Sequence, residues 1–232
     1  MSAAPSGSVP KKIRASRFVV RPDPVWLRSR ERNRPFTGAR RSANLGGLAH
    51  FKGTVFQSTQ LFVEREFGVE RAGQVLAALS ADDRRVLSEV TPIAWVPVEP
   101  VMRYHHEMDR LCGKGDLAVC TRAGRFSAGW SLNTVLKVFL KFKSPNWLIE
   151  RSTSVWNRYH DTGRWATDLE RPGKFVSTLH EFAVRDPAMC ARLRGWLLGA
   201  IELTGGRNAS VQEVQCACRS GDKCAFAIEW AA

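Results

Sequence analysis

The sequence predicts an α+β fold, in which N-terminal helices pack on a C-terminal antiparallel sheet of about four strands. Three observations predict this fold. Apolar side chains recur at helical spacing between residues 55 and 159. After Gly163 the pattern changes to alternation with aromatic residues, which is typical of strands. One further helical stretch lies between two predicted hairpins, and this order of helices followed by strands favours α+β.

Composition excludes several classes of protein. The 232 residues are 44% apolar and 25% charged, which does not fit a disordered, collagen-like or coiled-coil chain. No apolar run reaches the roughly 18 residues that a membrane helix needs, and the basic N-terminus lacks the apolar region of a signal peptide. We therefore expect a cytoplasmic protein without a membrane span, whose six cysteines are thiols or metal ligands.

The charge is unevenly distributed along the chain. The net charge is +13, and residues 1–45 hold 11 basic and two acidic residues, whereas the remainder holds 24 and 20. We predict a disordered basic leader over residues 1–48 and a single domain over residues 49–232. The leader either attracts polyanions weakly or is inert, and whether it is translated stays open. A nearly balanced domain gives no reason to expect a specific nucleic-acid partner.

The N-terminal helices are predicted from apolar periods and from start and stop signals. Gly68 ends the first helix, Ser80 caps the third, Pro100 precedes the fourth, Asp116 caps the fifth, and Ser144 with Pro145 starts the last. The predicted helices cover about residues 55–67, 70–79, 82–90, 102–111, 117–130, 132–142 and 145–159.

The C-terminal part reads as two hairpins around one helix. A turn at residues 171–174 joins strands over about 165–169 and 175–184. Asp186 and Pro187 start a helix that runs to Leu203 before Gly205 and Gly206. Strands over about 210–216 and 224–230 follow, joined by a turn at residues 220–222.

The last hairpin carries a candidate metal site. Glu213, Cys216 and Cys224 are spaced E-x2-C-x7-C, and the turn between the strands brings the two cysteines close. Cys190, at the start of the preceding helix, is a candidate fourth ligand. Three thiolates and one carboxylate suit a closed, structural zinc site. The alternative is that these cysteines are small buried core residues.

Strand geometry raises one condition on this site. Glu213 and Cys216 are three residues apart, so strict alternation places them on opposite faces of the strand. A β-bulge, or an early end to the strand, is needed to direct both at one metal. Cys218 is a possible substitute for Cys216.

Two adjacent histidines are a second candidate site, and the sequence carries no recognisable catalytic motif. His105 and His106 lie about 100° apart on a helix, so one of them at most faces a haem or metal, and the alternative is a partly exposed pair. The sequence has no Gly-rich phosphate loop, no G-x-S-x-G and no H-E-x-x-H. We therefore do not expect an enzyme.

The C-terminal stretch resembles the end of 4-vinyl reductase domains, which are small-molecule sensor modules. The similar segments are Val211-Gln-Glu-Val-Gln-Cys216 and Ser220-Gly-Asp-Lys-Cys-Ala-Phe226. In those sensors a Cys near a helix, a Glu and two further Cys hold a zinc ion. The resemblance implies the same role for Cys190, Glu213, Cys216 and Cys224.

The front of the predicted domain resembles haem–nitric oxide binding domains, through Phe51-Lys-Gly-Thr-Val-Phe56 and Phe67-Gly68. That fold is related to the 4-vinyl reductase domain and to TRAPP tethering subunits. Residues 51–230 together resemble an uncharacterised paralogous family of myxobacterial proteins. The sequence lacks a clear Tyr-x-Ser-x-Arg haem-propionate motif, and His105 or His106 has to be assumed as the proximal ligand, so haem is not expected.

The resemblance implies an apolar pocket between the helices and the sheet. The alternative for most of its candidate residues is an ordinary core position. The pocket candidates are Phe126, Trp130, Phe139, Trp147, Trp156, Trp165, Phe175 and Trp196.

The expected function is a sensory domain that binds a small apolar or aromatic molecule and acts through a homodimer or a protein partner. Three alternatives stay open. The chain is an interaction or scaffold protein with a collapsed pocket, a haem-based gas sensor, or a tetrapyrrole reductase, which only the name of the 4-vinyl reductase domain suggests.

Overall fold

The computed structural model describes residues 49–135 and 144–231, which belong to one unit of the chain. The predicted leader and the C-terminal part of the predicted helix 132–142 lie outside these residues. No described helix is long and apolar enough to cross a membrane. The helices are α1 (Gly53–Phe67), α2 (Val69–Ala77), α3 (Ala81–Ser88), α4 (Val98–Cys112), α5 (Ala118–Val135), α7 (Pro145–Glu150), α8 (Ser152–Tyr159) and α9 (Pro187–Leu203).

The strands form two antiparallel sheets. A two-stranded sheet pairs β1 (His50–Lys52) with β2 (Trp95–Pro97) beside the N-terminal helices. The larger sheet has the strand order β3-β4-β6-β5, so the two predicted hairpins join side by side through β4 and β6. Its strands are β3 (Arg164–Arg171), β4 (Lys174–His180), β5 (Arg207–Gln215) and β6 (Cys224–Ala231). The predicted α+β class is therefore confirmed.

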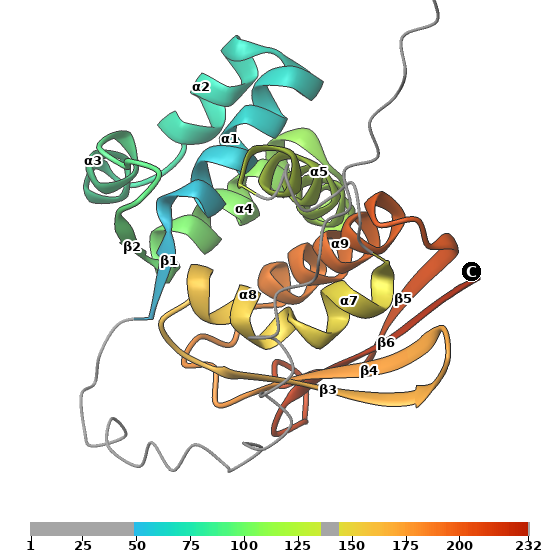
Figure 1. Cartoon of the computed structure of the whole chain (residues 1–232). Helices are drawn as coiled ribbons and strands as arrows, with labels where there is room; N and C mark the ends of the chain where they lie inside the picture. The colour runs from blue at the N-terminus through green and yellow to red at the C-terminus, as the bar shows by residue number, and fades with distance from the viewer. Residues whose placement is uncertain (1–48, 136–143, 232) are drawn as a thin grey trace, which may run out of the picture. The chain divides into compact units, whose positions relative to one another are not determined.

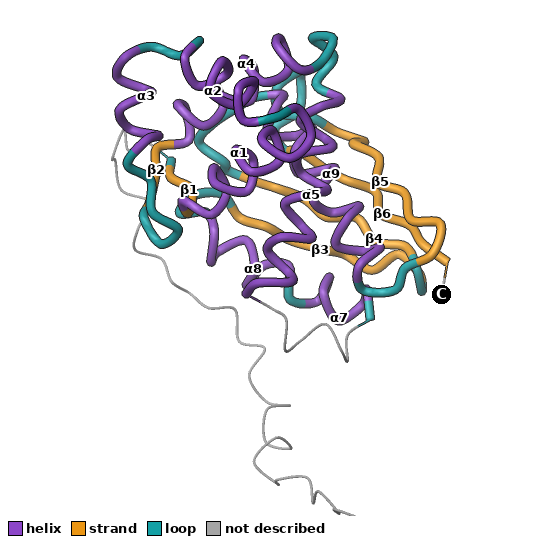
Figure 2. The backbone as a smooth tube through the Cα atoms, turned by 90° about the horizontal axis from the view of Figure 1, so that it is seen from above, coloured by secondary structure: helices purple, strands orange, loops and turns teal. Residues whose placement is uncertain are grey.

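Three layers position the candidate sites. Helices α7, α8 and α9 lie over one face of the larger sheet, and α8 contacts β3 while α9 contacts β5 and β6 (Figure 1). The N-terminal helices lie on the other side of α9, where α5 runs beside it (Figures 1 and 2). The main core is continuous through these layers and includes Phe51, Tyr104 and Phe226, all fully buried.

Glycines allow α5 and α9 to pack backbone to backbone. A Cβ on Gly124 of α5 would overlap the carbonyl oxygen of Arg192, and one on Gly195 of α9 would overlap the carbonyl oxygen of Thr121. Small residues are therefore required at this crossing, because any side chain would force the two helices apart.

Three of the predicted start and stop signals act where the sequence places them, whereas Pro100 lies inside the first turn of α4 rather than before it. The Ser80 hydroxyl accepts a hydrogen bond from the Asp83 amide and so caps α3. The Asp186 carboxylate accepts one from the Ala188 amide at the start of α9, with Pro187 in the first turn. Gly68 ends α1 with a positive φ of 90°, a conformation that favours glycine.

The structure corrects several predicted boundaries. One helix, α5, runs through residues 130–132, where a break between two helices is predicted. The predicted helix 145–159 is two helices, which meet at Arg151. Strand β4 ends at His180 rather than at residue 184, because Glu181 takes a positive φ of 54° and turns the chain.

Candidate functional site

A partly open cavity lies beside α8 and α9. It has a volume of about 50 Å3 and is lined by α1, α5, α8, α9 and the start of β3. Apolar side chains form much of its wall, including Val55, Val155, Leu193 and Leu197. The remaining lining residues are Thr54, Ser131, Ser152, Trp156, Tyr159, His160, Trp165, Arg192 and Trp196.

A stack of aromatic rings fixes one wall of the cavity. The His160 imidazole lies on the Trp156 indole with 3.7 Å between ring centroids, and Trp156 in turn stacks on Trp165 at 5.4 Å. The Trp156 Nε1 donates to the carbonyl oxygens of Thr162 and Gly163 at 3.0 and 3.2 Å. These contacts hold the indole of Trp156 in place against the cavity.

Four residues of the cavity lining each carry a buried polar atom that has no hydrogen-bond partner among the described residues. Thr54 Oγ1, His160 Nε2, Trp165 Nε1 and Arg192 Nε are buried and form no hydrogen bond. Native proteins leave few such atoms, so four at one cavity are an unusual concentration.

Burial keeps His160 neutral at physiological pH. Desolvation lowers the pKa of His160 to about 3, and the nearby charge of Arg192 acts in the same direction. Its Nδ1 lies 3.1 Å from the Trp156 carbonyl oxygen, so Nδ1 carries the proton and Nε2 is left as an acceptor.

Arg192 is a buried cation without a counter-ion. Its residue is only 4% exposed, and it makes no hydrogen bond or ion pair within the described part of the chain. Desolvation lowers its pKa to about 10, which leaves the guanidinium charged at neutral pH. Arg192 is not among the predicted site residues. It shares the apolar face of its helix with Ala188 and Met189, and a charged residue in that position indicates a buried site.

The predicted pocket residues separate into several places. Trp156, Trp165 and Trp196 line the cavity described above. Phe126 and Trp130 line an open groove between α5 and α9. Trp147 packs against a small core cluster that includes Leu132 and Leu148, while Phe175 stacks on Trp230. Phe139 lies outside the described residues.

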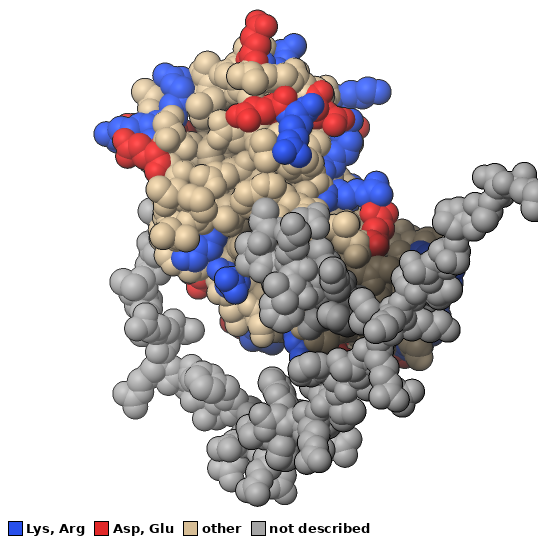
Figure 3. Space-filling model, turned by 45° about the horizontal axis from the view of Figure 1, so that its top comes forward, with Lys and Arg blue, Asp and Glu red and all other residues tan. Residues whose placement is uncertain are grey.

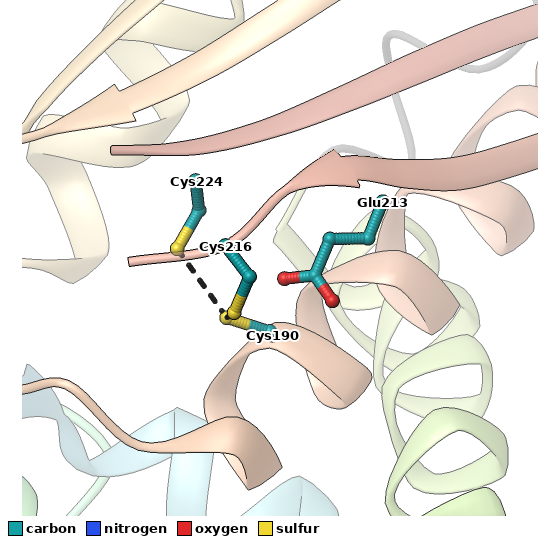
Figure 4. Close-up of side chains that lie close together, drawn as sticks. All are labelled: Cys190, Glu213, Cys216 and Cys224. Carbon is teal, nitrogen blue, oxygen red and sulfur yellow. Dashed lines mark hydrogen bonds between the residues drawn. The ribbon is translucent and has the colours of Figure 1, made fainter. Parts of the chain in front are cut away.

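The four predicted metal ligands lie together at the end of the larger sheet (Figure 4). One ligand atom from each of Cys190, Glu213, Cys216 and Cys224 lies within 4.8 Å of all the others. The Cys190 Sγ is 3.4 Å from the Cys224 Sγ and 3.8 Å from the Cys216 Sγ. A register shift after Glu213 supplies the bulge that strict alternation lacks.

Hydrogen bonds distinguish the groups of this cluster. Glu213 Oε2 accepts from Arg219 at 3.0 Å, while the buried Oε1 has no partner. The Cys190 thiol donates to Cys224, which lowers the pKa of Cys224 and raises the pKa of Cys190. The Ala217 amide also donates to the Cys224 sulfur at 3.4 Å and lowers the pKa of Cys224 further.

The two adjacent histidines point to different surroundings. His105 is fully buried; its Nδ1 lies 2.7 Å from the Val101 carbonyl oxygen and its Nε2 lies 3.4 Å from Thr59 Oγ1. His106 is exposed and its Nε2 lies 3.0 Å from the Asp186 carboxylate. The structure therefore does not bring the two imidazoles to a common site.

Comparison with known proteins identifies the fold. No model of a known protein family and no curated protein matches the sequence. Among solved structures, an H-NOX protein from S. oneidensis in the Fe(II)NO ligation state matches with a TM-score of 0.62. The match covers 78% of this chain and 99% of that one, at 17% sequence identity. The chain has an H-NOX-like fold.

Two further matches agree with this assignment. The Fe(II) unliganded H-NOX protein from K. algicida matches with a TM-score of 0.60 and 12% identity, over 78% of this chain and 97% of that one. A structure described as probing heme distortion in the H-NOX family matches with a TM-score of 0.61 and 14% identity, over 78% and 95%. The H-NOX resemblance of residues 51–68 agrees with these matches, whereas they do not support the 4-vinyl reductase or myxobacterial assignments.

The comparisons correct the predicted cofactors. The expectation that favoured zinc and set haem aside is wrong, because the matching proteins are described by iron ligation states and by heme, and zinc is not supported. The prediction relied on a missing three-residue motif. At 11–18% identity individual residues of a fold differ, so the absence of a short motif does not exclude a cofactor.

Proposed function

We propose that the protein is a sensory domain that binds a small molecule in the cavity beside α8 and α9. The four unpartnered polar atoms that line this cavity support the proposal most directly. The H-NOX-like fold supports it as well, since the matching proteins are described in liganded and unliganded states. On the face shown in Figure 3, acidic and basic side chains lie interspersed, so this face has no continuous basic patch of the kind that binds nucleic acid.

The cavity can be tested by filling it. Val155 lines the cavity, whereas Ser154, its neighbour on α8, is exposed. We expect phenol to change the tryptophan fluorescence and raise the melting temperature of the wild type and of Ser154→Trp. Val155→Trp is expected to lose both responses, because the indole occupies the space. A response in Val155→Trp equal to that of the wild type would place the binding site elsewhere.

Haem-based gas sensing is the finer form of this proposal that the comparisons favour over a zinc-centred module. His160 offers the donor that haem iron requires, since its Nε2 is neutral, buried and unpartnered. The space does not match as the side chains stand, because about 50 Å3 lies well below the roughly 300–1,000 Å3 of pockets for larger ligands. Haem binding at His160 therefore requires the tryptophans of the aromatic wall to move.

A haem titration separates this form from direct ligand binding. If these tryptophans move to admit haem, haemin added to purified protein is expected to give a shifted Soret band that His160→Ala abolishes. His106→Ala is the matched control, because His106 lies outside the cavity and is exposed. A Soret band that persists in His160→Ala would contradict the assigned iron ligand.

We infer a separate metal centre at Cys190, Glu213, Cys216 and Cys224. The unpartnered Oε1 of Glu213 among three sulfur atoms supports it. A site of this kind has no open position and therefore fits a structural role. Elemental analysis of untagged protein, purified without chelators, is expected to find about one metal ion per chain and to identify it. Glu229→Gln, further along β6 from Cys224, is expected to keep the ion, whereas Cys190→Ser is expected to lose it.

We propose a cytoplasmic location for the protein. All six cysteines are free, including the close group at the sheet end, and this supports a reducing cytoplasmic compartment. We propose that the signal is passed to a second copy of the chain or to a protein partner. Light scattering with and without phenol tests whether the chain forms a dimer. A monomer under both conditions would indicate that the signal passes to a different protein.

A further inference from the structure

The cavity beside α8 and α9 carries an unbalanced set of hydrogen-bonding groups. Nine buried side-chain polar atoms lack a partner in the described part of the chain, and four of them belong to residues that line this one cavity. Their concentration in one place indicates a ligand more than imperfect packing, since scattered single atoms would be expected from packing alone.

Three of the four atoms are available as hydrogen-bond donors. The Arg192 Nε–H and the Trp165 Nε1–H can only donate, and the Thr54 hydroxyl can do so. The fourth, His160 Nε2, is an acceptor, because Nδ1 keeps the ring proton for the Trp156 carbonyl oxygen. The complementary molecule therefore offers several acceptors and one donor.

Charge narrows the class further. Arg192 is 4% exposed and has no carboxylate partner among the described residues. The ionisable groups that act on it are the Cys120 thiol, His105 and His160, and none of these supplies a negative charge at neutral pH. An unpaired buried cation is costly, and an anion that enters the cavity offsets this cost.

Size and wall chemistry set the remaining limits. About 50 Å3 exceeds the space of a single water molecule but admits only a few non-hydrogen atoms. Val55, Leu193 and Leu197 present apolar surface to the same space.

We propose that the cavity binds a small hydroxycarboxylate, with its carboxylate held by Arg192 and Trp165 and its hydroxyl donating to His160 Nε2. This inference rests on the proposed ligand-binding function and names the class of ligand. Lactate is a probe of suitable size and chemistry. Propionate lacks its hydroxyl group and lactamide lacks its charge, so the three compounds test the two contacts separately.

Binding is measured by the melting temperature and by the tryptophan fluorescence of the full chain. Lactate is expected to raise the melting temperature and to change the fluorescence. Propionate is expected to bind about tenfold more weakly, which corresponds to one lost hydrogen bond. Lactamide is expected to give no response. Equal responses to lactate and lactamide would overturn the proposal, because the cation would then have no role.

Arg192→Met provides the second test, with Arg194→Met as the control. Arg194 lies two residues further along α9, is exposed and donates to Thr121. Arg192→Met is expected to abolish the lactate response and to raise the melting temperature of the ligand-free protein, because it removes an unpaired buried charge. A purely structural role for Arg192 predicts the opposite change, a lower melting temperature, and that result together with an unchanged lactate response would refute the proposal.

Further measurements distinguish a variant that fails to fold from a different ligand in the cavity. If Arg192→Met does not fold, Trp165→Phe removes one donor and keeps most of the ring stack, and it is expected to weaken lactate binding about tenfold. Haemin also carries carboxylates, so a Soret band that depends on Arg192 would transfer the contact to haem and overturn the free acid as the occupant. If lactate fails while phenol binds, this inference fails and the proposed function stands; if no probe binds, both fail.

Discussion

The imidazole ring of His160 lies flat on the indole ring of Trp156, with 3.7 Å between ring centroids and 9° between the planes. The stack excludes water from the imidazole, and the same burial affects His105 on α4. In both residues desolvation lowers the pKa to about 3. The folded protein therefore resists protonation at two sites where the unfolded chain accepts protons.

The first prediction is a loss of stability in mild acid. The unfolded histidines take up protons as the pH falls below about 6.5, whereas the folded ones do so only near pH 3. The contribution of these two histidines to the free energy of unfolding is therefore fully present above pH 6.5. It decreases as the pH falls toward 3. His160→Phe keeps a stacked ring and is expected to lose about 2 kcal/mol less than the wild type between pH 7 and pH 5. Urea unfolding at the two pH values measures this difference, and equal losses would contradict the assignment.

The second prediction concerns an ion pair between α3 and α4. Arg103 donates from Nε and Nη2 to the two carboxylate oxygens of Asp83, both at 2.7 Å. These bonds lower the pKa of Asp83, so the stabilisation is present above pH 3.9 and is lost as the pH falls through the folded value. Because Arg103 is half exposed, Asp83→Asn is expected to cost only about 1–2 kcal/mol at pH 7.

Asp82 provides the control for this pair. Its side chain is 89% exposed and reaches the exposed Arg85. Asp82→Asn is expected to change the urea midpoint very little. Similar losses in both variants would indicate that the charge of the helix N-terminus matters, rather than the ion pair.

The third prediction tests the helix crossing. Gly195→Ala places a Cβ onto the carbonyl oxygen of Thr121, and the helix backbones must separate to admit it. We expect the free energy of unfolding to fall by about 3 kcal/mol. Gly73 is an exposed helical glycine of α2 with no neighbouring atom in the way. Gly73→Ala is expected to have the opposite effect, a gain of about 0.5–1 kcal/mol. Two changes of the same sign in chemical denaturation would argue against backbone contact.

The fourth prediction follows from the proposed metal centre. Arg219 holds one carboxylate oxygen of Glu213 and so orients the other toward the sulfur atoms. Arg219→Ala is expected to lower the affinity for the metal about tenfold, measured by competition with a chelator. Arg171→Ala, at the exposed end of β3, should leave it unchanged. Equal retention in both variants would show that Arg219 does not position the ligand.

The parts of the fold that the sequence predicts correctly carry a local signal. Helix α9 has a capping Asp186, a proline in its first turn and an apolar period, and its bounds agree with the prediction. Strands β1 and β2 have three residues each, which is too short for any period to register. The break at Arg151 has no glycine or proline to announce it.

The candidate sites divide in the same way. The spacing of Glu213, Cys216 and Cys224 indicates a cluster, because a hairpin brings its own ends together. The cavity is assembled from α1, α5, α8, α9 and β3, and no local pattern relates Thr54 to His160 or Arg192. The one sequence signal for this cavity is a charged residue, Arg192, on the apolar face of its helix. Apolar periodicity alone does not reveal such a residue.

Helix α9 carries Cys190 of the sulfur cluster and, two residues further on, Arg192 of the cavity. Less than one turn of helix therefore separates the proposed metal centre from the proposed ligand cavity. Any such coupling is reciprocal by thermodynamic necessity: an ion that tightens ligand binding is itself held more tightly by the same factor when the ligand is present. Depletion of the metal would then alter the concentration at which the domain responds, and its response would report on two chemical supplies at once.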